Sequence, residues 1–117
     1  GLIEGGHSGR GLGDTFLKHA SRTKFLVHIL SSEDINLDDP WAGFQLVNQE
    51  LYKYDSELAK KKQIQVLNKI DLLDSDTLQK LRTKAVQDNK QVLFISALHK
   101  IGIDDFLQCF WKEIRDS

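Results

Sequence analysis

Three short apolar runs, separated by segments with helical periodicity, place the strongest constraint on how this 117-residue chain can fold. The runs cover residues 25–30, 64–67 and 92–95. A continuous apolar run of this length is typical of a strand that is covered on both faces. Strands that alternate with helices are joined by right-handed crossovers and form a parallel sheet. The pattern therefore predicts a three-layer α/β fold.

Four helices are expected beside these strands, and two of them lie in the first half of the chain. The first covers residues 14–22, where the apolar residues fall on one face. The second is expected to begin with Asp39 as N-cap and Pro40 in the first turn. Its apolar residues recur at spacings of three and four, which predicts a helix to about residue 61.

The other two helices follow the second and third apolar runs. Asp76 is the expected N-cap of the third helix, because Gln79 stands three residues later in capping-box position. The last helix, over residues 103–114, has a broad apolar face. Its aromatic residues are expected in the core.

Composition indicates one domain of an ordinary water-soluble type. Hydrophobic residues make up 40% of the chain, charged residues 28%, and the net charge is −1. No basic excess suggests a nucleic-acid partner, and no apolar stretch approaches membrane-spanning length. The single cysteine, Cys109, excludes an internal disulfide and fits a cytoplasmic location.

The first residues differ from the rest of the chain. Six of the eight glycines fall within residues 1–13, and there is no methionine anywhere. Glycine loses the most backbone freedom on ordering, so this segment is expected to be a loop whose partners lie elsewhere. We interpret the chain as a piece of a longer protein.

Two polar tracts directly follow the second and third predicted strands. They are Asn68-Lys69-Ile70-Asp71 and Ser96-Ala97-Leu98. In parallel α/β sheets, ligands bind outside the carboxyl ends of the strands, which is where both tracts stand. These seven residues are therefore the candidate ligand-binding residues.

The residue types in these tracts fit recognition of a guanine base. Guanine presents two neighbouring donors, N1–H and the N2 amine, and the carboxylate of Asp71 can accept both in charge-assisted bonds. Asn68 can bridge the two loops or reach the N7/O6 edge, and the alkyl stem of Lys69 can lie along the base. The backbone N–H of Ala97 can donate to guanine O6 but would oppose the N6 amine of adenine. Such a site rejects the wrong base by roughly 10⁴-fold, since a mismatch leaves its polar groups unpaired.

Each tract alone has a simpler interpretation. Asn68 and Asp71 are residue types that stabilise turns by bonding their own backbone, and Ser96 is one that caps the turn after it. The combination of two such tracts, each after a strand and in this order, favours nucleotide contact over plain loops.

In this order the two tracts look like the guanine-specificity loops of P-loop GTPases of the translation-factor type. The opening segment resembles one group within that class, the Obg family of ribosome-associated GTPases. The resemblance covers the whole chain, and in the opening it is carried by Gly1-Leu2-Ile3-Glu4-Gly5, Gly9, Gly11-Leu12-Gly13, Phe16-Leu17-Lys18-His19 and Arg22-Thr23.

The resemblance implies that residues 1–117 are the carboxyl half of an Obg-type GTPase domain. Gly1 would be the last glycine of the Asp-x-Pro-Gly motif and would contact the γ-phosphate, and the second switch would begin with Leu2, Ile3, Glu4 and Gly5. The phosphate-binding loop and the Mg²⁺-binding threonine are absent from the chain. The intact parent is therefore expected to bind GTP or GDP with Mg²⁺ held by its amino-terminal half, and to hydrolyse GTP slowly, while this chain alone does not.

The same resemblance implies a role in assembly of the large ribosomal subunit in the cytoplasm. Two other functions remain open: a GTPase of another subfamily without a ribosomal role, and a GTPase-like interaction module. Glu4 and His7 are candidates for a general base, but as members of a glycine-rich loop they leave the catalytic residue unassigned. An uncovered sheet edge is also expected to favour self-association.

Overall fold

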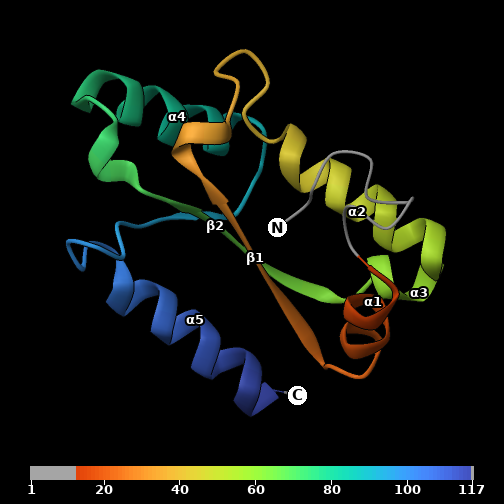
Figure 1. Ribbon diagram of the computed structural model, residues 1–117. Coiled ribbons are helices and arrows are strands. Elements are labelled where there is room, and N and C mark those ends of the chain that lie inside the picture. Colours follow the sequence, from red (N-terminus) through yellow and green to blue (C-terminus); the bar gives the residue numbers. More distant parts are fainter. Residues whose placement is uncertain (1–12, 117) are drawn as a thin grey trace.

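A computed structural model describes residues 13–116 as helices packed on a parallel sheet (Figure 1). The sheet has three strands in the order β1-β2-β3. They are β1 (Phe25–Ser31), β2 (Lys62–Asn68) and β3 (Val92–Phe94). All three strands coincide with the predicted apolar runs and pair in parallel, which confirms the α/β fold with a parallel sheet.

The strand register brings the carboxyl ends of the strands to one edge of the sheet. Ser31 lies opposite Asn68, so that β1 and β2 end side by side. Leu67 lies opposite Phe94, so that β3 ends one residue before β2 on the same side. The two candidate tracts therefore leave the sheet together.

Five α-helices and two short 3₁₀ helices accompany the strands in the described part of the chain. The α-helices are α1 (Asp14–Ser21), α2 (Ala42–Tyr54), α3 (Ser56–Ala59), α4 (Ser75–Gln87) and α5 (Ile103–Asp116). The 3₁₀ helices, η2 (Ser32–Asp34) and η3 (Ile70–Leu72), directly follow β1 and β2.

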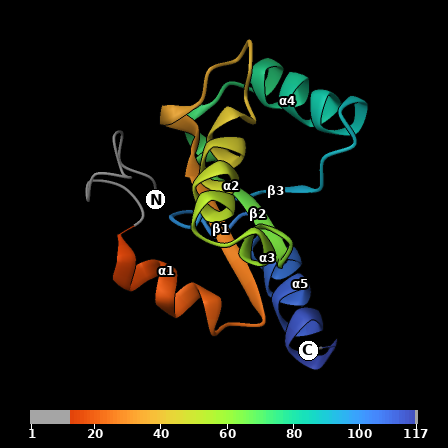
Figure 2. The same ribbon diagram turned by 90° about the vertical axis from the view of Figure 1, so that its right-hand side faces the viewer.

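The helices form two layers with the sheet between them (Figure 2). Helix α5 covers one face, where Phe106 and Phe110 pack near Val66 and Ile95. Trp111, which was expected in the core, is 56% exposed because it lies on the outer side of this helix. Helices α2 and α4 cover the other face. Because successive strand residues point to opposite faces, each core residue of β2 packs against the helices on one face only. The members of the α2/α4 core are Trp41, Phe44, Leu67, Ile70, Leu81, Ala85, Val92 and Phe94.

The expectation of a single helix from Asp39 to about residue 61 was wrong at both ends. The chain turns at residues 36–41, where the N–H of Asp39 donates to the carbonyl of Asn36 at 3.0 Å. Helix α2 starts only at Ala42, after Trp41, whose side chain is buried and donates to Asp88 Oδ2 at 2.8 Å. This tertiary contact fixes where the chain enters the helix.

A break at Asp55 gives the described part five α-helices where four were expected. The Asp55 side chain accepts the N–H of Glu57 at 3.0 Å, so it caps a new helix, α3, and ends the old one. Its extended backbone, with φ −162° and ψ 119°, lets Leu58 turn into the core beside α1 and α2.

The N-cap of α4 is Asp74 and not Asp76 as predicted. Asp74 Oδ1 accepts the N–H of Thr77 at 2.7 Å. This bond lowers the pKa of the Asp74 carboxyl, because the charged form accepts it better. The backbone of Asp74 is extended, with φ −70° and ψ 164°, so the helix begins two residues before the expected position.

Candidate nucleotide-binding site

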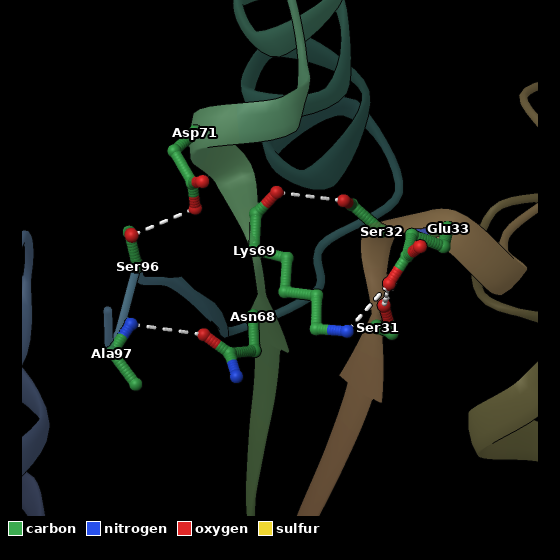
Figure 3. Close-up of polar contacts among 8 residues, drawn as sticks. All are labelled: Ser31, Ser32, Glu33, Asn68, Lys69, Asp71, Ser96 and Ala97. Atoms are coloured by element: carbon green, nitrogen blue, oxygen red, sulfur yellow. Dashed lines mark hydrogen bonds and ion pairs between the residues drawn. The ribbon is translucent and has the colours of Figure 1, made fainter. Parts of the chain in front are cut away.

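The loops after β2 and β3 are joined directly beyond the end of the sheet (Figure 3). The N–H of Ile95 donates to the carbonyl of Leu67 at 2.9 Å, and the N–H of Ile70 donates to the carbonyl of Ile95 at 3.2 Å. The side chain of Ile70 is buried in the α2/α4 core, so its contribution to the site is as an anchor for η3. These backbone bonds fix the spacing between the two candidate tracts.

The carboxylate of Asp71 is oriented by Ser96. Ser96 is fully buried, and its Oγ donates to Asp71 Oδ1 at 2.7 Å. The same hydroxyl accepts the N–H of His99 at 3.2 Å. Because a charge-assisted bond of this length is strong, the Asp71 side chain, which is 17% exposed, has a defined direction at the mouth of the sheet.

The side chain of Asn68 connects the two loops, as one of its predicted roles requires. Asn68 Oδ1 accepts the N–H of Ala97 at 3.0 Å. This bond points the amide nitrogen of Asn68 away from Ala97, so that it remains a donor at the site (Figure 3). The Ala97 N–H that was expected to meet guanine O6 already has an acceptor here, so it would have to be shared with the base.

Lys69 connects the base loop to the end of β1. Its backbone is left-handed, with φ 64° and ψ 35°, and its carbonyl accepts Ser32 Oγ at 2.7 Å. Lys69 Nζ lies 2.5 Å from Glu33 Oε1. This pairing lowers the pKa of Glu33 and raises that of Lys69. The ammonium group is thereby directed toward η2, and the alkyl stem of Lys69 extends from the end of β2 toward Glu33 (Figure 3).

The loop after Ser96 is closed by two backbone bonds between Ser96 and Ile101, both 3.0 Å long. Gly102 follows with φ +72°, and a Cβ there would stand 2.5 Å from the carbonyl oxygen of Phe94. Only glycine fits this position, because both its φ and its close backbone approach exclude a side chain. Leu98 projects from the loop and is 82% exposed.

The structure therefore joins Asn68 to Ala97 and Asp71 to Ser96. Lys69 is directed toward Glu33 and Ile70 into the core, while Leu98 is exposed. Gly1, Leu2, Ile3, Glu4 and Gly5, and the general-base candidate His7, lie outside the described residues.

Three neighbouring residues were not identified from the sequence: Ser32, Glu33 and His99. Ser32 and Glu33 are 37 and 36 positions from Lys69, so no local pattern indicates their contacts. His99 could have been noticed, because a serine three residues before it can bond its backbone as in a common turn.

Two further features concern only residues 13–116. No group of three or more His, Cys, Asp or Glu side chains could hold a metal ion within that range. None of the helices in that range has both the length and the apolar character needed to cross a membrane.

A three-stranded parallel sheet between helices, with two polar loops joined at its carboxyl edge, is consistent with part of an α/β domain of the P-loop GTPase type. The chain matches no protein-family model. It is 53% identical over 112 residues to the GTPase Obg of Desulfovibrio desulfuricans, covering 96% of this chain and 31% of that protein. It is also 50% identical to the GTPase Obg of Oleidesulfovibrio alaskensis, covering 99% of this chain and 32% of the relative.

A further GTPase Obg, from Nitratidesulfovibrio vulgaris, is 50% identical over all 117 residues, which make up 32% of its length. The chain belongs to the Obg family of GTPases. It spans about a third of the length of these curated relatives.

Proposed function

We propose that residues 1–117 are the carboxyl half of an Obg-type GTPase domain and recognise the guanine base of GTP and GDP. The residues assigned to the nucleotide are Gly1, Asn68, Lys69, Asp71, Ser96, Ala97 and Leu98. Ile70, which was also a candidate, is buried in the core and anchors the loop. The observation that carries this proposal is the bond from the buried Ser96 hydroxyl to Asp71, which holds a carboxylate at the carboxyl end of the sheet.

The polarity of the site matches guanine and opposes adenine. Asp71 offers carboxylate oxygens to two donors, and guanine N1–H and N2–H₂ are such a pair. The amide nitrogen of Asn68 can donate to N7 or O6, and adenine would place an amine where guanine has O6. An adenine nucleotide would leave the carboxylate without its donors, at a cost that accounts for the expected selectivity.

The intact parent protein, which contains both halves of the domain, is the proposed GTP hydrolase. Phosphoryl transfer depends on a Lys-bearing phosphate loop and on Mg²⁺, and neither the loop sequence nor a metal-binding cluster occurs in residues 13–116. As the resemblance implies, Mg²⁺ would be held by residues of the amino-terminal half. Leu2 stands where relatives in the wider class carry a water-orienting glutamine, so turnover is expected to be slow. This chain alone is expected not to hydrolyse GTP.

The γ-phosphate is expected to order the switch that begins with Gly1, Leu2, Ile3, Glu4 and Gly5. Loss of that phosphate on hydrolysis would release the segment, and the change would serve as the signal of a slow molecular switch. The resemblance to ribosome-associated GTPases supports a role in assembly of the large ribosomal subunit, in the cytoplasm.

Self-association through the open sheet edge is a further part of the proposal. Strand β1 has no neighbour on one side among residues 13–116, and Ile29 at that edge is 48% exposed. An uncovered edge of this kind pairs readily with another chain unless the rest of a longer protein covers it.

The decisive experiment is a titration of the full-length protein with fluorescent GDP in the presence of Mg²⁺, followed by competition with unlabelled GDP and ADP. Displacement by GDP at concentrations at least about 10³-fold below those of ADP is expected. Absent binding of GDP, or equal displacement by GDP and ADP, would instead favour a GTPase-like interaction module without guanine-specific function.

The ribosomal role is tested separately by co-sedimentation with large ribosomal subunits in GTP and in GDP. Association that depends on the nucleotide state is expected. GDP-specific binding without such association would favour a GTPase of another subfamily, with no ribosomal role.

A further inference from the structure

His99 is placed against the carboxylate that is assigned to the base. Its Nε2 lies 3.7 Å from Asp71 Oδ2, while its backbone N–H donates to Ser96 Oγ at 3.2 Å. Ser96 donates to the other carboxylate oxygen, Oδ1. The two oxygens of Asp71 therefore face two different neighbours, a hydroxyl donor and an imidazole.

The charge of the imidazole decides whether the second neighbour competes for Asp71. At 3.7 Å a neutral ring makes no hydrogen bond with Oδ2. A protonated ring is attracted to the carboxylate and donates to it, closing the small remaining gap. Guanine needs the carboxylate oxygens for N1–H and N2–H₂, so the protonated ring occupies an acceptor that the base requires.

Several other charged side chains lie near His99. Asp71 faces His99 directly, and Lys100 is the next residue in sequence. Lys69 is paired with Glu33 and also interacts with Asp34 and Asp71. Among these neighbouring side chains His99 is the imidazole, the type of side chain that serves as a charge switch near neutral pH.

We propose that His99 is a positioning residue of the base site, and that its protonated form competes with guanine for the carboxylate of Asp71. The inference rests on the proposed guanine recognition. It predicts that the affinity for guanine nucleotides depends on pH through His99, which is not one of the seven candidate residues. His99 itself does not contact the base in the bound state, since the base takes its place at Oδ2.

The test measures the dissociation constant of GDP for the full-length protein and for His99→Gln between pH 5.5 and 8.0. The ratio of the two constants removes the titration of the nucleotide phosphates, which is common to both proteins. Near pH 8 the ratio is expected to be close to one. At pH 5.5 the unmodified protein should bind GDP about two- to fivefold more weakly than His99→Gln, which is the range for an exposed ion pair.

Two further variants sharpen the result. His99→Arg carries a permanent charge, so it should show weakened GDP binding at pH 8.0 as well. His19→Gln removes another exposed histidine, on α1, and should leave the pH profile unchanged. A ratio that stays flat from pH 5.5 to 8.0 would overturn the proposal for His99, provided that GDP is still preferred over ADP. Loss of the preference for GDP over ADP in the unmodified protein would overturn the proposed function itself.

Discussion

Ser96 Oγ donates to Asp71 Oδ1 over 2.7 Å, and this bond connects residues 25 positions apart in the sequence. Ser96 has no exposed surface, and the same hydroxyl accepts the N–H of His99. One buried hydroxyl thus orients both the carboxylate assigned to the base and the loop that follows β3.

Replacement of this hydroxyl should weaken nucleotide binding. In Ser96→Ala, Asp71 Oδ1 loses its donor and the carboxylate is free to turn toward solvent. Since a hydrogen bond to a charged group contributes about 1.5–3 kcal/mol, GDP affinity of the full-length protein should fall by roughly tenfold or more. Calorimetric titration measures the change.

Ser75→Ala is the matched control, because Ser75 is exposed in the first turn of α4. It should bind GDP like the unmodified protein. Ser96→Thr keeps the hydroxyl and should restore part of the affinity. Equal GDP affinity in Ser96→Ala and the unmodified protein would contradict the role of Ser96.

Asp71→Asn should change which base is preferred. The amide presents a donor where guanine also presents donors, whereas xanthine carries an oxygen at that position. GTP affinity of the full-length protein should fall and XTP affinity should rise, as measured by competition against a fluorescent nucleotide. Asp76→Asn, at an exposed acid in α4, is the control and should keep the preference for GTP. Unchanged GTP affinity in Asp71→Asn would mean that another group recognises the base.

Gly102→Ala should destabilise the domain. The left-handed backbone at φ +72° costs a non-glycine residue roughly 1–2 kcal/mol, and the new Cβ would collide with the Phe94 carbonyl. A loss of about 2 kcal/mol or more in the free energy of unfolding is expected from chemical denaturation. Gly13→Ala is the control, because a Cβ there meets nothing within 4 Å. Similar stability of the two variants would show that the loop adjusts freely.

Stability should fall in mild acid because of His28. The ring is buried on β1 beside Phe44, at 4.8 Å between ring centroids, and neither ring nitrogen has a partner among residues 13–116. Burial lowers the pKa of His28 to about 4. As the pH falls below about 6.5, His28 binds a proton in the unfolded chain but stays neutral in the folded protein. The free energy of unfolding is therefore highest above pH 6.5 and declines as the pH falls toward 4.

The variant that tests this is His28→Phe, which keeps an aromatic ring and cannot titrate. Between pH 7 and 4.5 the unmodified protein should lose up to about 2 kcal/mol more than the variant. The whole shift in the pKa of His28 would correspond to a larger loss of stability. We expect a smaller loss because the ring borders an open cavity of about 410 Å³, where water screens part of the charge. Denaturant titrations at the two pH values give the difference, and His19→Gln should follow the unmodified protein. Parallel curves for His28→Phe and the unmodified protein would refute the assignment.

The positions of the strands and of the candidate site followed from the sequence because both signals are local. Apolar runs of strand length indicate buried strands whatever their neighbours are, and the tracts at residues 68–71 and 96–98 directly follow two of them. Helix ends were less predictable. Asp39 and Asp76 have the right chemistry for N-caps, but α2 begins only after the buried Trp41, and Asp74 caps α4.

The sequence by itself determined the α/β class, the edge of the sheet at which the polar tracts gather, and the kinship with Obg GTPases. The tertiary structure alone decided that Ser96 orients Asp71, that Lys69 is paired with Glu33, and that His99 faces the carboxylate. The physical reason is the separation along the sequence between the residues that take part in each interaction. Periodicity and capping act over a few neighbouring residues, whereas hydrogen bonds and ion pairs between loops depend on the strand register that brings distant positions together.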